Sequence, residues 1–250
     1  MTNIIIQGIA GRMGRAVYEL VRQREDCRVA AGVDRADPGL PIPVAARLEE
    51  LAIRGDVLID FSSPEATRAA LRYCRGALLP CVICTTGLTA EDQALVFEAA
   101  KTIPVFQSAN MSLGVNLLAE LAQKAARLLG PSYDVEIIEK HHRNKLDAPS
   151  GTALMLLNAM QKAAETPYDP VVYGRHAARQ KRGAREIGIH AVRGGSIVGE
   201  HEVLFCGPDE VIALSHSAGS RSVFANGAIN AALFLANSIN KAPGLYSMKD

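Results

Sequence analysis

The sequence predicts an α/β protein with a Rossmann-like, doubly wound parallel sheet, plus a second α+β domain with a small open mixed sheet. Two observations predict this fold class. Short apolar strands such as Ile4–Ile6 alternate with amphipathic helices over the first part of the chain, which is typical of a parallel sheet. After Gly130-Pro131 the strands alternate apolar with polar residues, which indicates a different architecture. We place the first domain at residues 1–112 and 222–250, and the second at 113–221.

Length and composition limit the class of protein. The 250 residues carry a net charge of +1 and are 48% hydrophobic, which argues against disorder and against a global attraction to nucleic acid or a membrane. No run of about 18 apolar residues occurs, and the N-terminus enters a strand without a signal peptide. The five cysteines are odd in number and lie in apolar segments, so we expect reduced thiols in a cytoplasmic protein. Cys81-x-x-Cys84 lies within a strand, which disfavours a redox role.

The first strand leads directly into a glycine-rich loop. Gly8-x-x-Gly11-x-x-Gly14 follows the strand, and Ala10 takes the place of the second glycine in the usual dinucleotide fingerprint. A second strand, residues 28–33, ends at Asp34, twenty residues after Gly14. An acid at that distance is placed to bind an adenosine ribose, so the unit predicts a dinucleotide site rather than a plain turn with an accidental acid.

The residue after that acid bears on the choice of cofactor. The carboxylate of Asp34 favours a free ribose hydroxyl, as in NADH, whereas the guanidinium of Arg35 favours the 2′-phosphate of NADPH. We therefore expect the protein to use both NADH and NADPH.

Three further buried strands are expected, at 57–61, 79–84 and 103–106, and helices at 66–74, from Thr89 onward and at 113–129. Ligands of a doubly wound sheet bind where its parallel strands end. The loops at those ends are rich in small polar residues, which also favour ordinary turns, so both interpretations stay open for the later loops. The strand ends carry the glycine loop, Asp34, Phe61-Ser62, Thr85-Thr86-Gly87 and Ser108 to Met111.

The second domain is expected to begin with a strand over 134–139. A break at Thr166-Pro167 and a basic loop at 174–185 follow its helix. We expect that loop to be solvated or to cap a substrate rather than to bind nucleic acid, because it has no interleaved aromatic residues. Strands at 186–192, 196–206 and 210–217 are predicted to form an antiparallel meander, with His190, His201 and His216 as structural histidines. An apolar helix over 225–239 should return to the first domain.

The densest chemistry lies between Glu139 and Thr152. His141, His142 and Lys145 precede a turn at residues 147–150, and a helix opens at Gly151 with Ser150 as its N-cap. A helix start with glycine at the contact point binds anions, so this stretch predicts a pocket for a small acidic molecule with proton donors beside it. A metal site is disfavoured, because adjacent histidines on extended chain point to opposite faces and no cysteine or carboxylate has ligand spacing.

These residues resemble the dihydrodipicolinate reductase family of lysine and diaminopimelate biosynthesis. The resemblance lies in Glu139-x-His141-His142-x-x-Lys145-x-Asp147-x-Pro149-Ser150-Gly151-Thr152-Ala153 and in the glycine loop, and it spans nearly the whole chain. Further matches are Thr85-Thr86-Gly87, Asn110 to Asn116, Val198 to His201 and Phe224 to Ala228. Two departures are Cys84, where the family often has glycine, and a C-terminus that ends a little early.

The resemblance implies an NAD(P)H-dependent oxidoreductase. It would reduce 4-hydroxy-tetrahydrodipicolinate, a small dicarboxylate, to tetrahydrodipicolinate with loss of water, in a cytoplasmic homotetramer without a metal, nucleic-acid or membrane partner. The first domain would bind the cofactor, and the second would bind substrate and form the tetramer. The implied catalytic residues are His141 and Lys145; the substrate-binding residues are His142, Lys145, Ser150, Gly151 and Thr152; and the cofactor-binding residues are Gly8, Ile9, Ala10, Gly11, Arg12, Met13, Asp34, Arg35, Cys84, Thr85, Thr86, Ser108, Ala109, Asn110 and Met111.

Two other classes remain as alternatives. Another two-domain NAD(P)-dependent amino-acid dehydrogenase would share the first domain, and a non-catalytic dinucleotide sensor would keep the glycine loop. Neither class of protein needs proton donors clustered beside an anion-binding helix start, so neither explains the stretch from Glu139 to Thr152.

Overall fold

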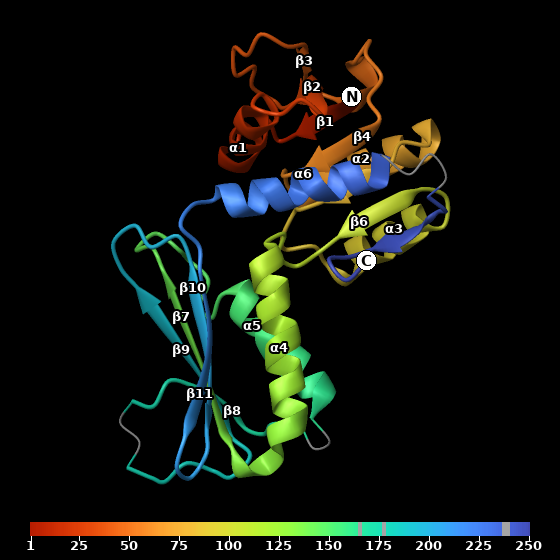
Figure 1. Ribbon diagram of the computed structural model, residues 1–250. Coiled ribbons are helices and arrows are strands. Elements are labelled where there is room, and N and C mark those ends of the chain that lie inside the picture. Colours follow the sequence, from red (N-terminus) through yellow and green to blue (C-terminus); the bar gives the residue numbers. More distant parts are fainter. Residues whose placement is uncertain (165–166, 177–178, 237–240) are drawn as a thin grey trace. The chain divides into compact units, whose positions relative to one another are not determined.

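The computed structural model describes residues 1–164, 167–176, 179–236 and 241–250. The chain divides into two compact units (Figure 1): Met1–Ser112 together with Arg221–Asp250, and Leu113–Ser220. The chain therefore leaves the first unit once and returns to it near its C-terminus.

The first unit is built on a seven-stranded parallel sheet in the order β12-β6-β5-β4-β1-β2-β3. The chain order runs outward from β1 in one direction and from β4 in the other, so the topological switch point lies between these two strands. Ligands of such sheets bind beyond the carboxyl ends of the strands at this point. The strands are β1 (Thr2–Gln7), β2 (Cys27–Val33), β3 (Val44–Ala45), β4 (Val57–Asp60), β5 (Cys81–Ile83), β6 (Pro104–Gln107) and β12 (Gly244–Tyr246).

Helices cover both faces of this sheet. One apolar core joins α1 (Arg12–Val21) and α6 (Ser222–Ala236) to one face. The other core joins α2 (Pro64–Ala77) and α3 (Ala90–Ala100) to the opposite face. A short 3-10 helix, η1 (Leu48–Glu50), lies before β4. Burial on both faces explains why these strands read as continuous apolar runs.

The predicted doubly wound sheet is confirmed, with changes at the element ends. The helix expected at 66–74 is longer and stops where Leu78 adopts a left-handed conformation (φ 52°). The strand expected at 79–84 is shorter, because only Cys81–Ile83 pairs with its neighbours. The edge strands β3 and β12 were not predicted, since segments this short carry no periodic pattern. The helix expected to reach Ile239 is described to Ala236, and Ile239 lies outside the described residues.

The second unit packs two helices on one side of a five-stranded mixed sheet (Figure 1). The strand order is β11-β10-β7-β9-β8, and the small open sheet that was predicted is confirmed. Thr166 of the predicted break lies outside the described residues. The elements are α4 (Leu113–Leu129), η2 (Gly130–Ser132), β7 (Asp134–His141), α5 (Gly151–Ala163), β8 (Val171–Tyr173), β9 (Ile187–Arg193), β10 (Glu200–Cys206) and β11 (Val211–Ser217).

The predicted antiparallel meander of three consecutive strands is wrong in one respect. β10 and β11 form an antiparallel pair, but β9 pairs in parallel with β7, which lies between β9 and β10. Arg193-Gly194-Gly195 therefore starts a crossing over β7 instead of a hairpin. Local turn chemistry predicted that the chain reverses but contained no information on which strand fills the centre of the sheet.

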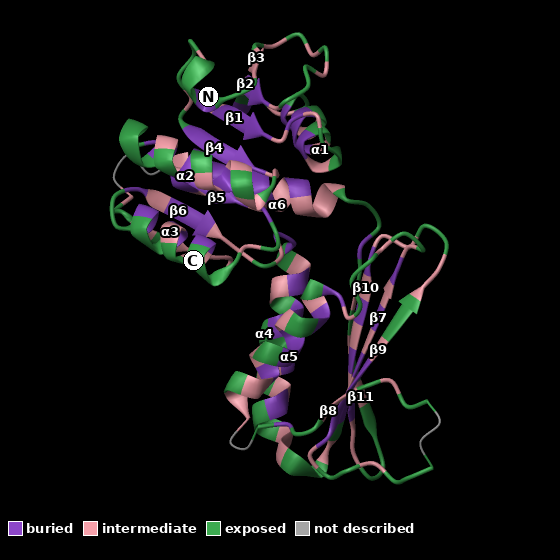
Figure 2. Cartoon of the chain, turned by 180° about the vertical axis from the view of Figure 1, so that it is seen from behind, coloured by how far each residue is buried: buried purple, intermediate pink, exposed green. Residues whose placement is uncertain are grey.

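One face of this sheet is packed on α4 and α5, and among the described residues no helix covers the other. Along β7, buried and half-buried residues alternate, so Val135 and Ile137 face the helices while Ile138 faces away. Figure 2 shows this alternation of burial along the strands. In the described parts of the chain, none of the helices has the combined length and apolar character that a membrane span needs.

Candidate functional site

The glycine loop of the first unit is a tight cradle at the start of α1. Gly8 has φ +80°, and a Cβ there would lie 2.5 Å from the carbonyl oxygen of Phe61. A Cβ on Gly14 would lie 2.1 Å from the carbonyl oxygen of Gly8, so only glycine lets the helix pack this closely. No side chain caps the first turn of α1, which leaves its amide end available to an anion. These features fit a dinucleotide pyrophosphate.

A first hollow opens beside this loop, where β2 ends. Asp34 and Arg35 line it together with Gly8 and Gly11. Asp34 Oδ2 also accepts a hydrogen bond of 2.9 Å from the Ala10 amide, so the acid fixes the loop as well as facing the hollow. Arg35 is 86% exposed and lies 3.4 Å from Glu65, which leaves its guanidinium accessible.

A second hollow of about 490 Å³ continues from the first along the strand ends and shares Gly11, Phe61 and Ser62 with it. Its volume is that of a small-molecule pocket. Phe224 also lines it, although the sequence analysis did not assign Phe224 to a site. The predicted cofactor residues that line this hollow are Gly11, Arg12, Met13, Cys84, Thr85, Thr86, Ser108, Ala109, Asn110 and Met111.

Two predicted cofactor residues, Ile9 and Ala10, line neither hollow. The Ile9 side chain is fully buried in the core, and a Cβ on Gly32 would lie 2.7 Å from it. Ala10 directs its amide at Asp34. Ile9 and Ala10 therefore contribute to the glycine loop through their backbone, and the apolar Ile9 side chain holds the loop to the sheet.

In the second unit, a fully buried carboxylate organises the stretch that was singled out in the sequence. Glu139 lies on the helix-facing side of β7, and its Oε2 is 2.6 Å from Nδ1 of His141. Arg193, at the end of β9, donates to both carboxylate oxygens, at 2.6 and 2.7 Å. The amide of Ser150 donates to Oε1 at 3.0 Å. The i, i+2 spacing on a strand puts Glu139 and His141 on one face.

The N-cap of α5 connects this group to a second histidine. Ser150 Oγ accepts from the amide of Ala153 and lies 2.9 Å from Nε2 of His201 on β10. The rings of His141 and His201 meet edge to face, with centroids 5.1 Å apart. His201 was predicted to be a structural histidine, and its contacts tie the helix start to β7 through His141.

The remaining predicted residues surround the helix start. Lys145 is half-buried, and its ammonium lies 2.8 Å from Asp147. Gly151 begins α5, and a Cβ there would meet nothing within 4 Å, so space is open beside the first turn. Thr152 follows it in that turn. His142 follows the last residue of β7, and its Nδ1 is buried without a hydrogen-bond partner among the described residues.

Burial sets the charge state of the two central histidines. Burial lowers the pKa of His141, although the carboxylate of Glu139 opposes this. Burial, together with nearby His141, lowers the pKa of His201 to about 4. The effect of Glu139, which alone would raise the pKa of His141, is therefore outweighed by burial. At neutral pH both rings are neutral, and the carboxylate places the His141 proton on Nδ1, which leaves Nε2 as an acceptor.

The sequence analysis did not assign Arg193, which lies between two predicted strands, to the site. The available signal was Glu139 itself: it shares a strand face with the apolar residues Val135 and Ile137, and a carboxylate buried on that face needs a cation. The pKa of Glu139 shows this balance, because burial raises it and the hydrogen bonds from Arg193 and His141 bring it below the ordinary value. Nothing in the sequence identified which arginine would pair with it.

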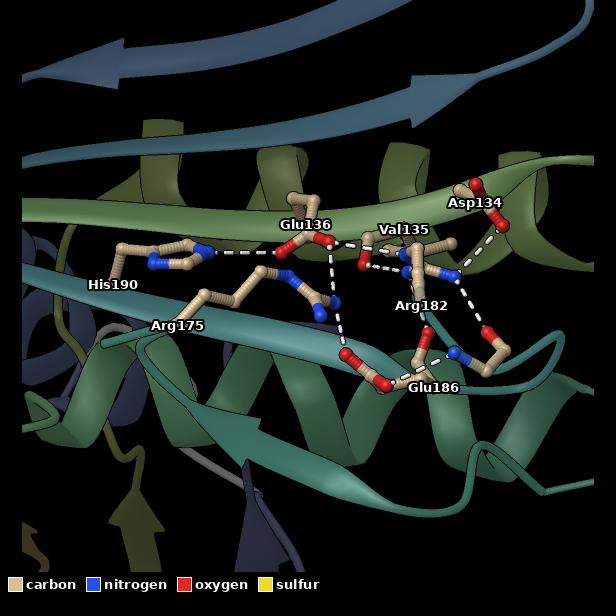
Figure 3. Close-up of polar contacts among 8 residues, drawn as sticks. Asp134, Val135, Glu136, Arg175, Arg182, Glu186 and His190 are labelled. Carbon is tan, nitrogen blue, oxygen red and sulfur yellow. Dashed lines mark hydrogen bonds and ion pairs between the residues drawn. The ribbon is translucent and has the colours of Figure 1, made fainter. Parts of the chain in front are cut away.

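The basic segment at 174–185 is attached to the sheet through its arginines (Figure 3). Arg182 donates to Glu136 at 3.1 Å, to Asp134 at 2.7 Å and to the carbonyl oxygen of Val135 at 2.8 Å. Arg175 pairs with Glu186. Arg182 is only 18% exposed, so the prediction of a solvated loop is wrong for this side chain, whereas Arg175 and most of the described residues of the segment are exposed, as a solvated loop requires.

Comparisons with known proteins cover the whole chain. Two family models match, "Dihydrodipicolinate reductase, N-terminus" over residues 2–111 and "Dihydrodipicolinate reductase, C-terminus" over residues 114–250. The 4-hydroxy-tetrahydrodipicolinate reductase of Caldanaerobacter subterraneus subsp. tengcongensis is 48% identical over 250 residues, which is 100% of this chain and 98% of that protein. The protein of the same name from Clostridium botulinum is 46% identical over 252 residues, with the same coverage.

A solved structure is similar along the full length. The dipicolinate-bound dihydrodipicolinate reductase from Paenisporosarcina sp. TG-14 has a TM-score of 0.80 and 27% sequence identity, and the match covers 99% of this chain and 97% of that one. Both architectures described above therefore occur together in that protein.

Proposed function

Because the chain belongs to the dihydrodipicolinate reductase family, we propose that it catalyses the NAD(P)H-dependent reduction of 4-hydroxy-tetrahydrodipicolinate to tetrahydrodipicolinate with loss of water. The observation that carries this proposal is the buried Glu139–His141–Arg193 group beside the open start of α5. Neither a dehydrogenase of another class nor a dinucleotide sensor would need that group.

The substrate would bind in the second unit through its carboxylates. The first-turn amides of Gly151 and Thr152 attract negative charge through the helix dipole, and the space beside Gly151 is open. Ser150 is the N-cap that precedes these amides, and we propose that His142 helps to hold the carboxylates. Loss of water from the hydroxylated ring would leave an unsaturated ring; a bound reduced cofactor would supply a hydride to it, and the neighbouring ring atom would then require a proton.

Lys145 is our proposed source of that proton. Its ammonium is a mobile donor in the loop that joins β7 to α5, within reach of Asp147. His141 is neutral and directs an Nε2 acceptor away from Glu139, so it can accept a proton or orient the substrate. Arg193 and Glu139 hold the tautomer and ring orientation of His141.

The direct test is consumption of reduced cofactor with freshly prepared 4-hydroxy-tetrahydrodipicolinate as substrate. We expect absorbance from the reduced nicotinamide to fall only when enzyme, substrate and cofactor are all present. Turnover of a simple amino acid in place of this ring, or binding of cofactor without turnover, would contradict the proposal.

The free thiols of Cys27, Cys74, Cys81, Cys84 and Cys206 also support our proposal of a cytoplasmic location.

Cofactor choice gives a prediction about Asp34. We expect Asp34→Ala to lower kcat/KM for NADH about tenfold relative to NADPH, because the variant loses a charged acceptor for the ribose hydroxyl and a charge that repels a 2′-phosphate. Steady-state kinetics with both cofactors measures the ratio. Using a ratio cancels the loss of the bond between Asp34 and Ala10, which affects both cofactors equally.

Two variants check this interpretation. Asp34→Asn retains an acceptor for the Ala10 amide and should shift preference towards NADPH without disturbing the loop. Arg35→Ala should shift it towards NADH. An unchanged cofactor ratio in Asp34→Ala would remove Asp34 from the ribose site.

A second prediction concerns assembly. The sheet of the second unit has one uncovered face, on which Ile138, Val192 and Leu204 lie among charged residues. Exposed apolar residues on an open sheet favour association. We propose that these sheets pack between copies into a homotetramer, and light scattering should give about four times the chain mass of 26.7 kDa.

The matched variants are Leu204→Glu, on the uncovered face, and Leu78→Glu, on the exposed C-terminal end of α2 in the other unit. The first should lower the mass in solution and the second should leave it unchanged. A monomeric mass for the natural sequence at micromolar concentration would refute the assembly.

A further inference from the structure

Asp60, the last residue of β4, is fully buried and is held only by neutral groups. Oδ1 accepts from the amide and hydroxyl of Ser62, at 3.0 and 2.5 Å, and from the side-chain amide of Gln7 at 3.3 Å. Oδ2 accepts from the hydroxyls of Thr67 and Thr85, at 2.5 and 3.2 Å. The strand ends in a carboxylate that accepts five hydrogen bonds and has no cation beside it among the described residues.

The other buried carboxylates of the described chain are balanced differently. Asp92 pairs with Arg68, Glu139 with Arg193, and Glu186 with Arg175. Asp60 has no ion-pair partner among the described residues. An unpaired buried carboxylate is costly, and such costs are retained where a function needs them.

The pKa of Asp60 is consistent with that cost. Burial raises the pKa of Asp60, and the hydrogen bonds from Ser62 and Thr67 oppose the increase. A raised pKa means that the ionised form disfavours folding at neutral pH, and a nearby cation would remove the penalty.

The groups that hold Asp60 also form the walls of the two hollows of the first unit. Ser62 lines both, Gln7 lines the first, and Thr85 lines the second. Asp60 therefore lies one side chain behind the surface of the second hollow. A dinucleotide with its adenosine at Asp34 and its pyrophosphate at the glycine loop would extend its nicotinamide into this second hollow.

We propose that Asp60 provides the negative charge that balances the oxidised nicotinamide ring and so favours donation of the hydride. The reduced ring is neutral and the oxidised ring carries one positive charge, so a fixed carboxylate nearby stabilises the ring as the hydride leaves. Asp60 does not touch the ring; it acts through its charge and through the loops that it holds. This inference rests on the cofactor site proposed above.

The test is the ratio of affinities for oxidised and reduced cofactor in Asp60→Asn. Asparagine fits the site, because its Oδ1 can accept from Ser62 and Gln7 while its amide donates to the hydroxyls of Thr67 and Thr85. We expect Kd for NAD⁺ to rise about tenfold and Kd for NADH to change less than about twofold. NADH is titrated by fluorescence and NAD⁺ by competition. The melting temperature should stay equal or rise, because a buried charge is removed.

Two variants separate charge from structure. Asp56→Asn makes the same substitution at an exposed residue just before the opposite end of the strand and should leave the affinity ratio unchanged. Thr67→Val removes a hydrogen bond that Thr67 donates to Asp60 but keeps the charge of Asp60. It should therefore lower the melting temperature without changing the ratio of affinities for NAD⁺ and NADH.

Other results would overturn the inference. An unchanged affinity ratio in Asp60→Asn, or an equal loss of affinity for both cofactors, would make Asp60 a loop anchor only. If Asp60→Asn does not fold, Asp60→Ser removes the same charge and must give the same shift in ratio. If the natural protein binds neither cofactor, the proposed cofactor site falls together with this inference, whereas an unchanged ratio refutes the inference alone.

Discussion

Lys145→Ala is expected to lower kcat by about 10²–10⁴-fold while leaving the affinity for NADH intact, because general acid catalysis contributes about that factor. The variant keeps the cofactor unit unchanged and removes only the proposed proton donor. His141→Ala should lower kcat by a similar order, since it removes the acceptor that Glu139 orients. Steady-state measurements with saturating cofactor give kcat, and an equilibrium titration with NADH gives the affinity for NADH.

Matched variants decide between proton transfer and simple charge balance. Lys140 lies on the opposite, uncovered face of the same strand and pairs with Glu200 at 3.0 Å, so Lys140→Ala should change kcat by less than about twofold. Thr152→Ala should act mainly on the KM for substrate, because its proposed role is to hold a carboxylate. If Lys145→Ala and His141→Ala both raised KM and left kcat near that of the natural protein, the proton-transfer assignment would be wrong.

Arg193→Ala is expected to destabilise the protein by about 3–5 kcal/mol, because it leaves the fully buried Glu139 without its cation. The pKa of Glu139 lies below its ordinary value, so its contribution to stability is present above the unfolded pKa and is lost as pH falls through the folded pKa. The variant should lose that acid-dependent part of the stability. Urea unfolding over a range of acidic to neutral pH measures both effects.

A surface pair serves as the control for this prediction. Arg22 and Glu19 lie 3.6 Å apart with both side chains 59% exposed, so Arg22→Ala should change stability by less than about 1 kcal/mol. Arg193→Lys keeps the charge but loses the bidentate geometry of the guanidinium. Its loss of stability should lie between those of Arg193→Ala and Arg22→Ala. Equal stability of Arg193→Ala and the natural protein would show that Ser150 and His141 suffice to support the carboxylate.

The sequence by itself determined the parts of this protein that depend on local pattern. The apolar runs ending at Gly8, Asp34 and Asp60 indicated a parallel sheet, because strands covered on both faces must be apolar throughout. Glycine spacing located the loop at the start of α1, and Ser150 located the start of α5. Family-level motifs then identified the class of reaction before any geometry was known.

Only the tertiary structure decided the contacts between distant segments. The position of β7 between β9 and β10 overturned the predicted meander, because strand pairing depends on which faces can be buried together and not on the intervening turn. The same arrangement brings Arg193 to Glu139, residues that are far apart in the chain. It also buried Asp60 among hydroxyl groups, with no cation beside it in the described parts of the chain, since packing sets a residue's charge partners and its sequence neighbours do not reveal them.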